Sequence, residues 1–300
     1  MSLSRRTLLL GGALVLTGCT RQKVEAPPRL VLATGPDGAV FREIGAALAR
    51  VLAEQLPDTE VVAQPTGASV ENLTLLAAGK ADLALSSLDA IERPESVRAV
   101  GRLYDSFMQI AVRKESPIQS LADLAGRRIS LGPVGSGTEF TGRRLLQYLD
   151  GPSAVDERMA HAVASRRLAE GSLDALLALT GIPTDAVYNI KDQVRLINLQ
   201  SEAVRLYREF RGPYIPATIP QSVYNPIPAC HTFAVPNLLL AHGSLSADVV
   251  EVVTRTVFTE TARIVEGHPE ASRINVRTGI ATGQVPLHDG ALRWFQSVKR

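Results

Sequence analysis

The chain has 300 residues, with 32 Lys and Arg against 30 Asp and Glu. This balance argues against nucleic acid as a partner, because phosphate binding requires a basic face. The length is sufficient for one large domain or for two lobes of ordinary size.

The first nineteen residues are typical of an exported protein. Arg5 and Arg6 precede an apolar run, Leu8–Leu16, that is too short to cross a bilayer, because a helical span needs about 20 residues. Small residues and a cysteine follow, so we expect residues 1–18 to be a signal peptide. The alternative is a short N-terminal membrane anchor in which the cysteine is incidental.

The Leu-Thr-Gly-Cys ending resembles a lipobox, which implies that Cys19 is lipidated and begins the mature chain. Residues 19–28 would then be a lipidated tether that ends in two prolines. Residues 4–9 also resemble a twin-arginine signal, so the Tat and Sec export routes both stay open. The mature chain would carry 30 basic and 30 acidic residues, and Cys230 would have no intramolecular disulfide partner.

Strand and helix patterns alternate along the rest of the chain. The first half is expected to contain strands at 29–33, 60–64, 81–86 and 104–112, and helices at 39–55, 69–78 and 120–124. The second half is expected to contain strands at 128–131 and 195–199, and helices at 138–149, 164–170 and 247–266. Residues 213–228 hold five prolines and no helical period, which predicts an extended crossing segment. This alternation is typical of mainly parallel sheets with helices on both faces, where ligands bind beyond the carboxyl ends of the strands.

Three strand-to-helix turns combine glycine with small hydroxyl residues. They are residues 34–38 (TGPDG), 66–69 (TGAS) and 135–138 (GSGT). Glycine lets a ligand approach the backbone closely, and the start of a helix offers free N–H groups that suit a carboxylate. If the turns converge on one cleft, they predict a small-anion site. Taken singly, each is also compatible with an ordinary capped turn.

Three longer segments point to one family. They are residues 66–90 (TGASVENLTLLAAGKADLALSSLDA), 118–139 (IQSLADLAGRRISLGPVGSGTE) and 285–295 (VPLHDGALRWF). In this order they resemble the TAXI family, the solute receptors of one class of tripartite ATP-independent periplasmic (TRAP) transporters. The similarity extends over almost all of the mature chain.

The resemblance implies an α/β, type II periplasmic-binding-protein fold, with two lobes, a hinge and an interlobe ligand cleft. We expect lobe 1 at 29–110 plus 230–300 and lobe 2 at 111–229, with crossings near 104–112 and 228–240. The implied ligands are small organic acids, including amino acids and keto acids. We expect a monomer that needs no cofactor.

The implied ligand contacts come from five places in the chain. They are Thr34, Gly35 and Gly38 of the first turn, Ser69 and Asn72, Ser86 and Ser87, Gly135, Ser136, Gly137 and Thr138, and Gly181 and Pro183.

Two positions depart from the family pattern. Asp37 lies among the glycines of the first turn, where it could cap the next helix or pair with an ammonium group. A glutamine is common after the Ala-Asp-Leu-Ala strand, where this chain has Ser86-Ser87-Leu88. Both departures leave the exact ligand open.

Other chemistry has little support in the sequence. The five histidines are scattered, and Cys230, His231 and His242 have no recognised zinc spacing. The Gly-x-Ser-x-Gly elbow of serine hydrolases is absent from the sequence. We therefore expect neither a metal site nor a catalytic residue. Asn237 is a better polar candidate for the hinge or cleft than Arg166 and Arg167, which are expected on a solvated helix face.

The predicted function is that of an extracytoplasmic solute-binding lipoprotein that delivers its ligand to TRAP membrane subunits. One alternative is a receptor of the same fold that serves an ABC transporter or a sensor kinase. Another is an exported enzyme on an α/β scaffold, which the fold alone does not exclude.

Overall fold

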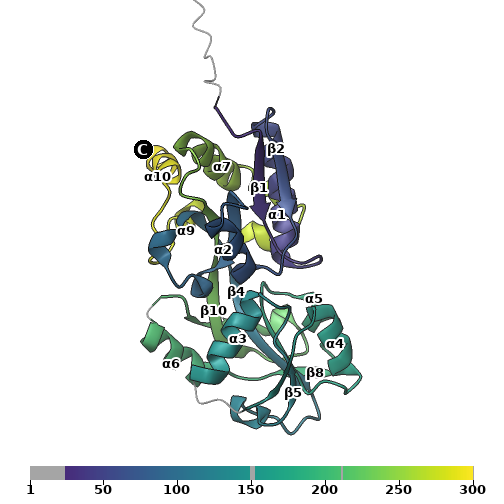
Figure 1. Ribbon diagram of the computed structural model, residues 1–300. Helices are drawn as coiled ribbons and strands as arrows, with labels where there is room; N and C mark the ends of the chain where they lie inside the picture. The colour runs from purple at the N-terminus through teal and green to yellow at the C-terminus, as the bar shows by residue number, and fades with distance from the viewer. Residues whose placement is uncertain (1–23, 149–152, 211, 300) are drawn as a thin grey trace, which may run out of the picture.

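The computed structural model describes residues 24–148, 153–210 and 212–299, so the expected signal peptide and Cys19 lie outside it. In these ranges no helix is long and apolar enough to cross a membrane. The described chain folds into two lobes, one above the other in Figure 1, and two long strands run through the waist between them.

The two long strands are β4 (Arg98–Arg113) and β10 (Cys230–Ala241). They are antiparallel neighbours, paired from Arg98 with Ala241 to Phe107 with Ala234. Towards the lower lobe, β4 continues beside β7 and β10 continues beside β9. Within the shared stretch, the other edge of β10 pairs with β3 in the upper lobe. Each lobe therefore has part of both strands in its sheet.

The upper lobe has the strand order β2-β1-β3-β10-β4. Its first three strands are parallel, and β10 runs antiparallel beside β3. Its other elements are β1 (Arg29–Ala33), α1 (Val40–Gln55), β2 (Glu60–Gln64), α2 (Ser69–Ala77), β3 (Leu83–Ser87), α7 (Ala247–Thr259), α8 (Thr261–Ile264), α9 (Val276–Gly279) and α10 (Asp289–Ser297), with short 3₁₀ turns at η1 (Leu88–Ala90), η2 (Pro94–Ser96) and η5 (Pro269–Arg273).

The lower lobe has the strand order β6-β5-β7-β4, with β8 beside β4 and β9 beside β10. Here too three parallel strands meet an antiparallel strand from the waist. Its other elements are η3 (Leu121–Leu124), β5 (Arg128–Ser130), α3 (Gly137–Tyr148), β6 (Val155–Glu157), α4 (His161–Ala169), β7 (Ala175–Thr180), α5 (Asp185–Tyr188), β8 (Val194–Leu196), α6 (Gln200–Phe210), β9 (Ile215–Ile219) and η4 (Gln221–Val223).

The two lobes therefore have the same sheet arrangement. In each sheet three parallel strands lie side by side, and the next strand is an antiparallel one that crosses between the lobes. This is the two-lobed, type II periplasmic-binding-protein fold, as expected. The parallel strands end at the waist, so the turns that follow them face the other lobe (Figure 1).

The helices form because their apolar residues recur on one face. In α1, Ile44, Leu48 and Leu52 lie one turn apart and are almost fully buried, against strand residues such as Leu30 and Leu32. A second apolar cluster continues from the upper lobe through β4 and β10 into the lower lobe. The waist is therefore packed, and the lobes are not independent bodies on a loose linker.

Several elements differ from the sequence expectation. β4 begins at Arg98 rather than at residue 104, because its upper half is covered on both faces and has no polar alternation. Residues 213–228 do not cross between the lobes; they contain β9, which pairs with β10 inside the lower lobe. The long helix expected at 247–266 breaks at Glu260 into α7 and α8.

Candidate functional site

A cavity of about 310 Å³ lies between the lobes. At the waist its wall includes Tyr104 and Ser106 of β4 and Asn237 of β10. Asn237 Nδ2 donates hydrogen bonds to Ser106 Oγ at 2.8 Å and to the carbonyl of Tyr104 at 3.3 Å. The remaining wall comes from turns of both lobes, so closing or opening the lobes would change the cavity directly.

Helices of both lobes begin at this cavity: α1 and α2 of the upper lobe, and α3, α4 and the one-turn α5 of the lower lobe. Its wall includes residues 39–41 at the start of α1, 68–69 at the start of α2, 136–138 at the start of α3 and 160–162 at the start of α4. The first N–H groups of a helix have no partner inside the helix, and they carry its partial positive charge. These helix starts favour an anionic group such as a carboxylate, whereas Asp37 and Asp185 of the same wall favour a cationic group.

Hydroxyl groups from both lobes line the same cavity. Ser69 Oγ accepts hydrogen bonds from the N–H of Ser87 at 3.1 Å and from its hydroxyl at 3.2 Å. Ser136 Oγ accepts from the N–H of Glu139 at 3.1 Å, and Thr138 Oγ1 accepts from the N–H of Leu179 at 3.0 Å. Each hydroxyl thus fixes its own turn and presents an oxygen to the cavity.

The structure brings about half of the predicted contacts to the cavity wall: Gly38, Ser69, Ser87, Ser136, Gly137, Thr138 and Pro183. The others lie behind the wall or where the lobes touch: Thr34, Gly35, Asn72, Ser86, Gly135 and Gly181. Thr34 and Ser86 are completely buried, and the Thr34 hydroxyl donates to the carbonyl of Gln64 at 2.7 Å. Direct ligand contact remains a prediction for the residues of the wall.

Asn72 has a different place from the one expected. Its side chain is completely buried, and Nδ2 donates to the carbonyls of Thr34 at 2.6 Å and Leu85 at 2.7 Å. Its Oδ1 accepts from the Thr66 hydroxyl at 2.6 Å. All its polar atoms are used within the protein, so Asn72 ties two of the glycine turns to β3 and supports the wall from behind.

Glycines allow the lobes to approach each other closely. The carbonyl of Gly135 accepts a hydrogen bond from the N–H of Val70, at the start of α2, at 3.1 Å. A Cβ on Gly181 would collide with Cγ of Glu270, and a Cβ on Gly137 would lie 3.1 Å from the hydroxyl oxygens of both Ser69 and Ser87. These contacts join the two lobes, so the structure is a closed arrangement.

Asp37 lines the cavity but does not cap α1. The N-cap residue is Ala39, which makes no side-chain cap bond, and the exposed Asp37 carboxylate lies 3.4 Å from Nε of Arg42. The capping interpretation is therefore wrong. Pairing of Asp37 with a ligand ammonium group stays a prediction.

Two of the scattered histidines also belong to the wall. His161 is the first residue of α4, and its Nε2 lies 3.3 Å from Thr138 Oγ1. His268 Nδ1 accepts from the N–H of Glu270 at 3.1 Å. Burial lowers the pKa of His161 to about 4 and lowers that of His268 as well, so both rings are neutral at pH 7. Neither histidine lies in a glycine turn, so the sequence offered no signal for them.

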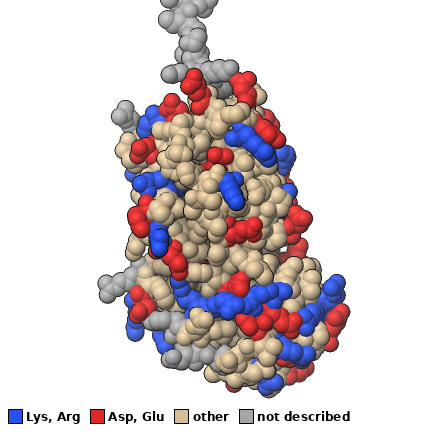
Figure 2. Space-filling model, viewed as in Figure 1, with Lys and Arg blue, Asp and Glu red and all other residues tan. Residues whose placement is uncertain are grey.

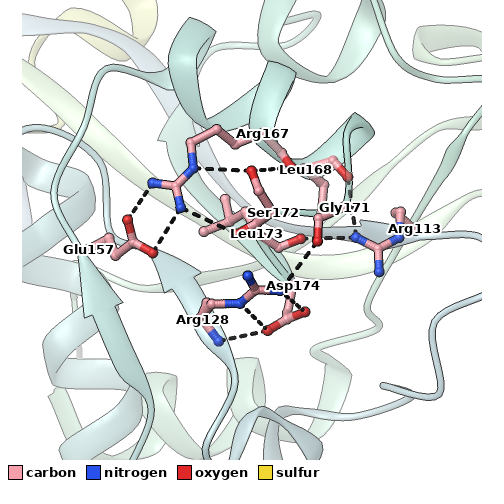
Figure 3. A network of polar contacts seen from close by, with 9 residues as sticks. All are labelled: Arg113, Arg128, Glu157, Arg167, Leu168, Gly171, Ser172, Leu173 and Asp174. Atoms are coloured by element: carbon pink, nitrogen blue, oxygen red, sulfur yellow. Dashed lines mark hydrogen bonds and ion pairs between the residues drawn. The ribbon is translucent and has the colours of Figure 1, made fainter.

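Among the described residues, no Lys or Arg lines the cavity. Arg167 lies instead in a polar network of the lower lobe, where it donates to the Glu157 carboxylate and to the carbonyl of Ser172 at 3.2 Å (Figure 3). The neighbouring Arg128 pairs with Asp174 in the same network. Arg167 is therefore a structural residue of a half-buried network rather than part of a solvated face.

Charge elsewhere is mixed. Basic and acidic side chains are interspersed over the face shown in Figure 2, on both lobes. In the described part of the chain, no three His, Cys, Asp or Glu side chains lie close enough together to hold a metal ion.

Three solved structures with this architecture share 12–16% of their residues with this chain. XAC2383 from Xanthomonas citri bound to ATP has a TM-score of 0.54 at 12% identity, over 91% of this chain and 96% of that chain. The alkanesulfonate-binding protein SsuA from Xanthomonas axonopodis pv. citri bound to MOPS has a TM-score of 0.49 at 16% identity, over 92% of each chain. ArtJ, the arginine-, lysine-, histidine-binding protein from Geobacillus stearothermophilus, has a TM-score of 0.48 at 13% identity, over 81% of this chain and 94% of that chain.

At these low sequence identities, the similarity to the three structures supports a shared fold and nothing about function. The sequence pattern of one family, in contrast, matches nearly the whole described chain, over residues 32–297. The matched region includes the long waist strands and every turn that lines the cavity. The chain belongs to the NMT1-like family.

Proposed function

We propose that the chain is an extracytoplasmic solute-binding lipoprotein, which captures a small organic acid or amino acid and delivers it to a membrane transporter. One observation carries this proposal: helix starts and hydroxyl groups from both lobes meet around a single interlobe cavity of about 310 Å³. Such a cavity suits a ligand with a carboxylate, which the helix starts would hold without a basic side chain.

A binding role is favoured over catalysis by the composition of the wall. Among the described residues, neither His161 nor His268 has a serine or cysteine hydrogen-bonded to its ring, as the nucleophile of a hydrolase would be. We therefore propose a receptor that holds and releases its ligand without a chemical step.

The ligand class is tested with a thermal-shift screen of residues 20–300 against organic acids and amino acids. A ligand present at 100 times its Kd stabilises the folded state by about 2.7 kcal/mol, which corresponds to a rise in Tm of about 5 °C or more. Calorimetric titration of each hit then measures its affinity. A screen in which only ligands without a carboxylate raise Tm would contradict the proposed ligand class.

For the partner, we propose the membrane subunits of a TRAP-type secondary transporter, on the strength of the TAXI-like segments. An ABC transporter or a sensor kinase is the alternative partner for the same fold. Uptake measurements on proteoliposomes that contain the membrane proteins encoded by the neighbouring genes would distinguish these partners. Uptake driven by an ion gradient supports the TRAP proposal, uptake that requires ATP supports the ABC alternative, and neither is expected for a sensor.

We further propose that Cys19 carries the lipid that anchors the protein to the membrane, on the side of the periplasm or cell exterior. Cys19→Ser should release the protein from the membrane fraction or leave its signal peptide uncleaved. Fractionation followed by mass spectrometry of the N-terminus measures both effects. An unmodified Cys19 inside a longer mature chain would contradict this proposal.

A further inference from the structure

A buried carboxylate of the upper lobe docks on the lower lobe. Asp89 belongs to η1, directly after β3, and is only 3% exposed. Its Oδ2 accepts hydrogen bonds from the hydroxyl of Thr141 on α3 at 2.5 Å and from that of Tyr214 at 3.0 Å. Figure 1 shows α3 directly beneath α2, so these contacts cross from one lobe to the other.

In the described part of the chain, the cation that faces this contact is Arg144. Arg144 of α3 donates from Nη1 to the carbonyl of Asp89 at 3.2 Å and to Tyr214 Oη at 3.1 Å. Its Nη2 lies 3.9 Å from a carboxylate oxygen of Glu92, which follows Asp89 along the chain. Among the described residues, Arg144, Tyr214 and Glu92 are thus the charged or titratable groups around Asp89. β3 contains no titratable residue, and β10 is uncharged where it passes η1, beside Asn237.

The carboxylate is not fully satisfied in this closed arrangement. Oδ1 of Asp89 is buried and has no hydrogen-bond partner among the described residues. Burial raises the pKa of Asp89, although the hydroxyls of Thr141 and Tyr214 and the charge of Arg144 act in the opposite direction. Separation of the lobes would return the carboxylate to water, where its ionised form is favoured.

The contact also adjoins the cavity. The hydroxyl of Ser87, two residues before Asp89, lies against Ser69 in the cavity wall. A movement of α3 relative to the end of β3 would therefore change both the Asp89 contact and the cavity wall.

We propose that Asp89 is a proton-linked latch, a positioning residue that holds the lobes closed and takes up one proton from the solvent as they close. The proton binds to the carboxyl group as closure removes its water, and on opening it returns to water. The inference rests on the proposed function only in that opening and closing belong to a solute receptor. The closed form should be favoured as pH falls towards the ordinary pKa of aspartate, by up to tenfold per pH unit.

The test measures the lobe separation of the ligand-free protein between pH 7.5 and pH 4. Spin labels are attached at Lys80→Cys in the upper lobe and Asp192→Cys in the lower lobe, both exposed positions; Cys230 is buried and does not react. Asp89→Asn removes the titration with little change in size. Asp82→Asn is the matched control, because Asp82 accepts a hydrogen bond from the N–H of Val31 inside the upper lobe, at the other end of β3.

The closed fraction of the wild type and of Asp89→Asn can then be compared directly. The expected result is a closed fraction that rises as pH falls in the wild type and in Asp82→Asn, and a much flatter profile in Asp89→Asn. An equal slope in Asp89→Asn, or no slope in the wild type, would overturn the latch.

Thr141→Val provides a second test if Asp89→Asn does not fold. Loss of a hydrogen bond that favours the ionised carboxylate should move the closure profile to higher pH, and an unmoved profile would overturn the proposal. No ligand is used in either test, so a failed ligand screen and a failed latch are separate results.

Discussion

At the scale of single residues, His161 makes stability depend on pH. Its pKa is about 4 in the folded protein, because burial disfavours the charged ring, against an ordinary value of 6.5. Between these values the unfolded chain binds more protons, so this contribution is complete above pH 6.5 and is lost as pH falls towards 4. Urea unfolding at pH 7 and pH 5 should show a larger loss of stability in the wild type than in His161→Gln. The same loss in both proteins would contradict the assignment.

The substitution Gly137→Ala tests how closely the two lobes approach each other at this glycine. In Gly137→Ala the new Cβ would lie 3.1 Å from the hydroxyl oxygens of Ser69 and Ser87 in the other lobe. We expect a stable protein that closes less well and binds the ligand found by the screen at least fivefold more weakly, a loss of about 1 kcal/mol. Calorimetric titration measures the affinity. Gly243→Ala, where a Cβ would meet nothing within 4 Å, is the control and should bind normally.

For single residues, the sequence predicted which chemical groups form the cavity wall better than it predicted which residues face the cavity. Ser69, Ser136 and Thr138 were selected as hydroxyls at helix starts, and all three line the cavity. Asn72 and Gly181 were selected with them but point into the protein or at the other lobe. Whether such a residue faces the cavity depends on partners that are distant in the chain, such as Leu85 for Asn72 and Glu270 for Gly181. A local sequence pattern does not reveal these partners.

At the scale of elements, the first strands and helices of the upper lobe were predicted closely, because β1 and β2 are short strands that each lead into a glycine turn. The helix expected at 39–55 is α1 at Val40–Gln55, and the strand expected at 60–64 is β2. The lower lobe was harder, since α6 was not predicted at all. Its polar sequence, QSEAVRLYREF, buries only Ala203 and Leu206 fully, so its apolar stripe is narrow.

The hydrogen bonds between β10 and β4 at Asn237 should matter for both stability and binding. Asn237→Ala removes two cross-strand bonds and leaves Ser106 without its donor, which should cost about 1–3 kcal/mol of unfolding free energy. Ligand affinity should fall as well, because Asn237 and Ser106 both line the cavity. Urea unfolding and calorimetric titration give the two values. Asn189→Ala, on the exposed end of α5, serves as the control, and equal effects of the two substitutions would contradict a special role for Asn237.

At the scale of the whole molecule, we expect ligand binding to close the two lobes by bending at β4 and β10. Interlobe contacts such as Val70 to Gly135 form only when the lobes are together, and a ligand that bridges both lobes favours that state. Small-angle scattering should show a smaller radius of gyration at saturating ligand. An unchanged scattering profile would count against hinge closure.

The place of β10 in the sheet also determines when the protein can fold. The upper lobe contains the first strands of the chain, yet β10 at Cys230–Ala241 lies between β3 and β4 in its sheet. A growing chain therefore cannot complete its first lobe until more than two thirds of its residues have been made. Contacts of such long sequence separation form slowly. We therefore expect the sheet of the upper lobe to stay incomplete for most of the synthesis of the chain.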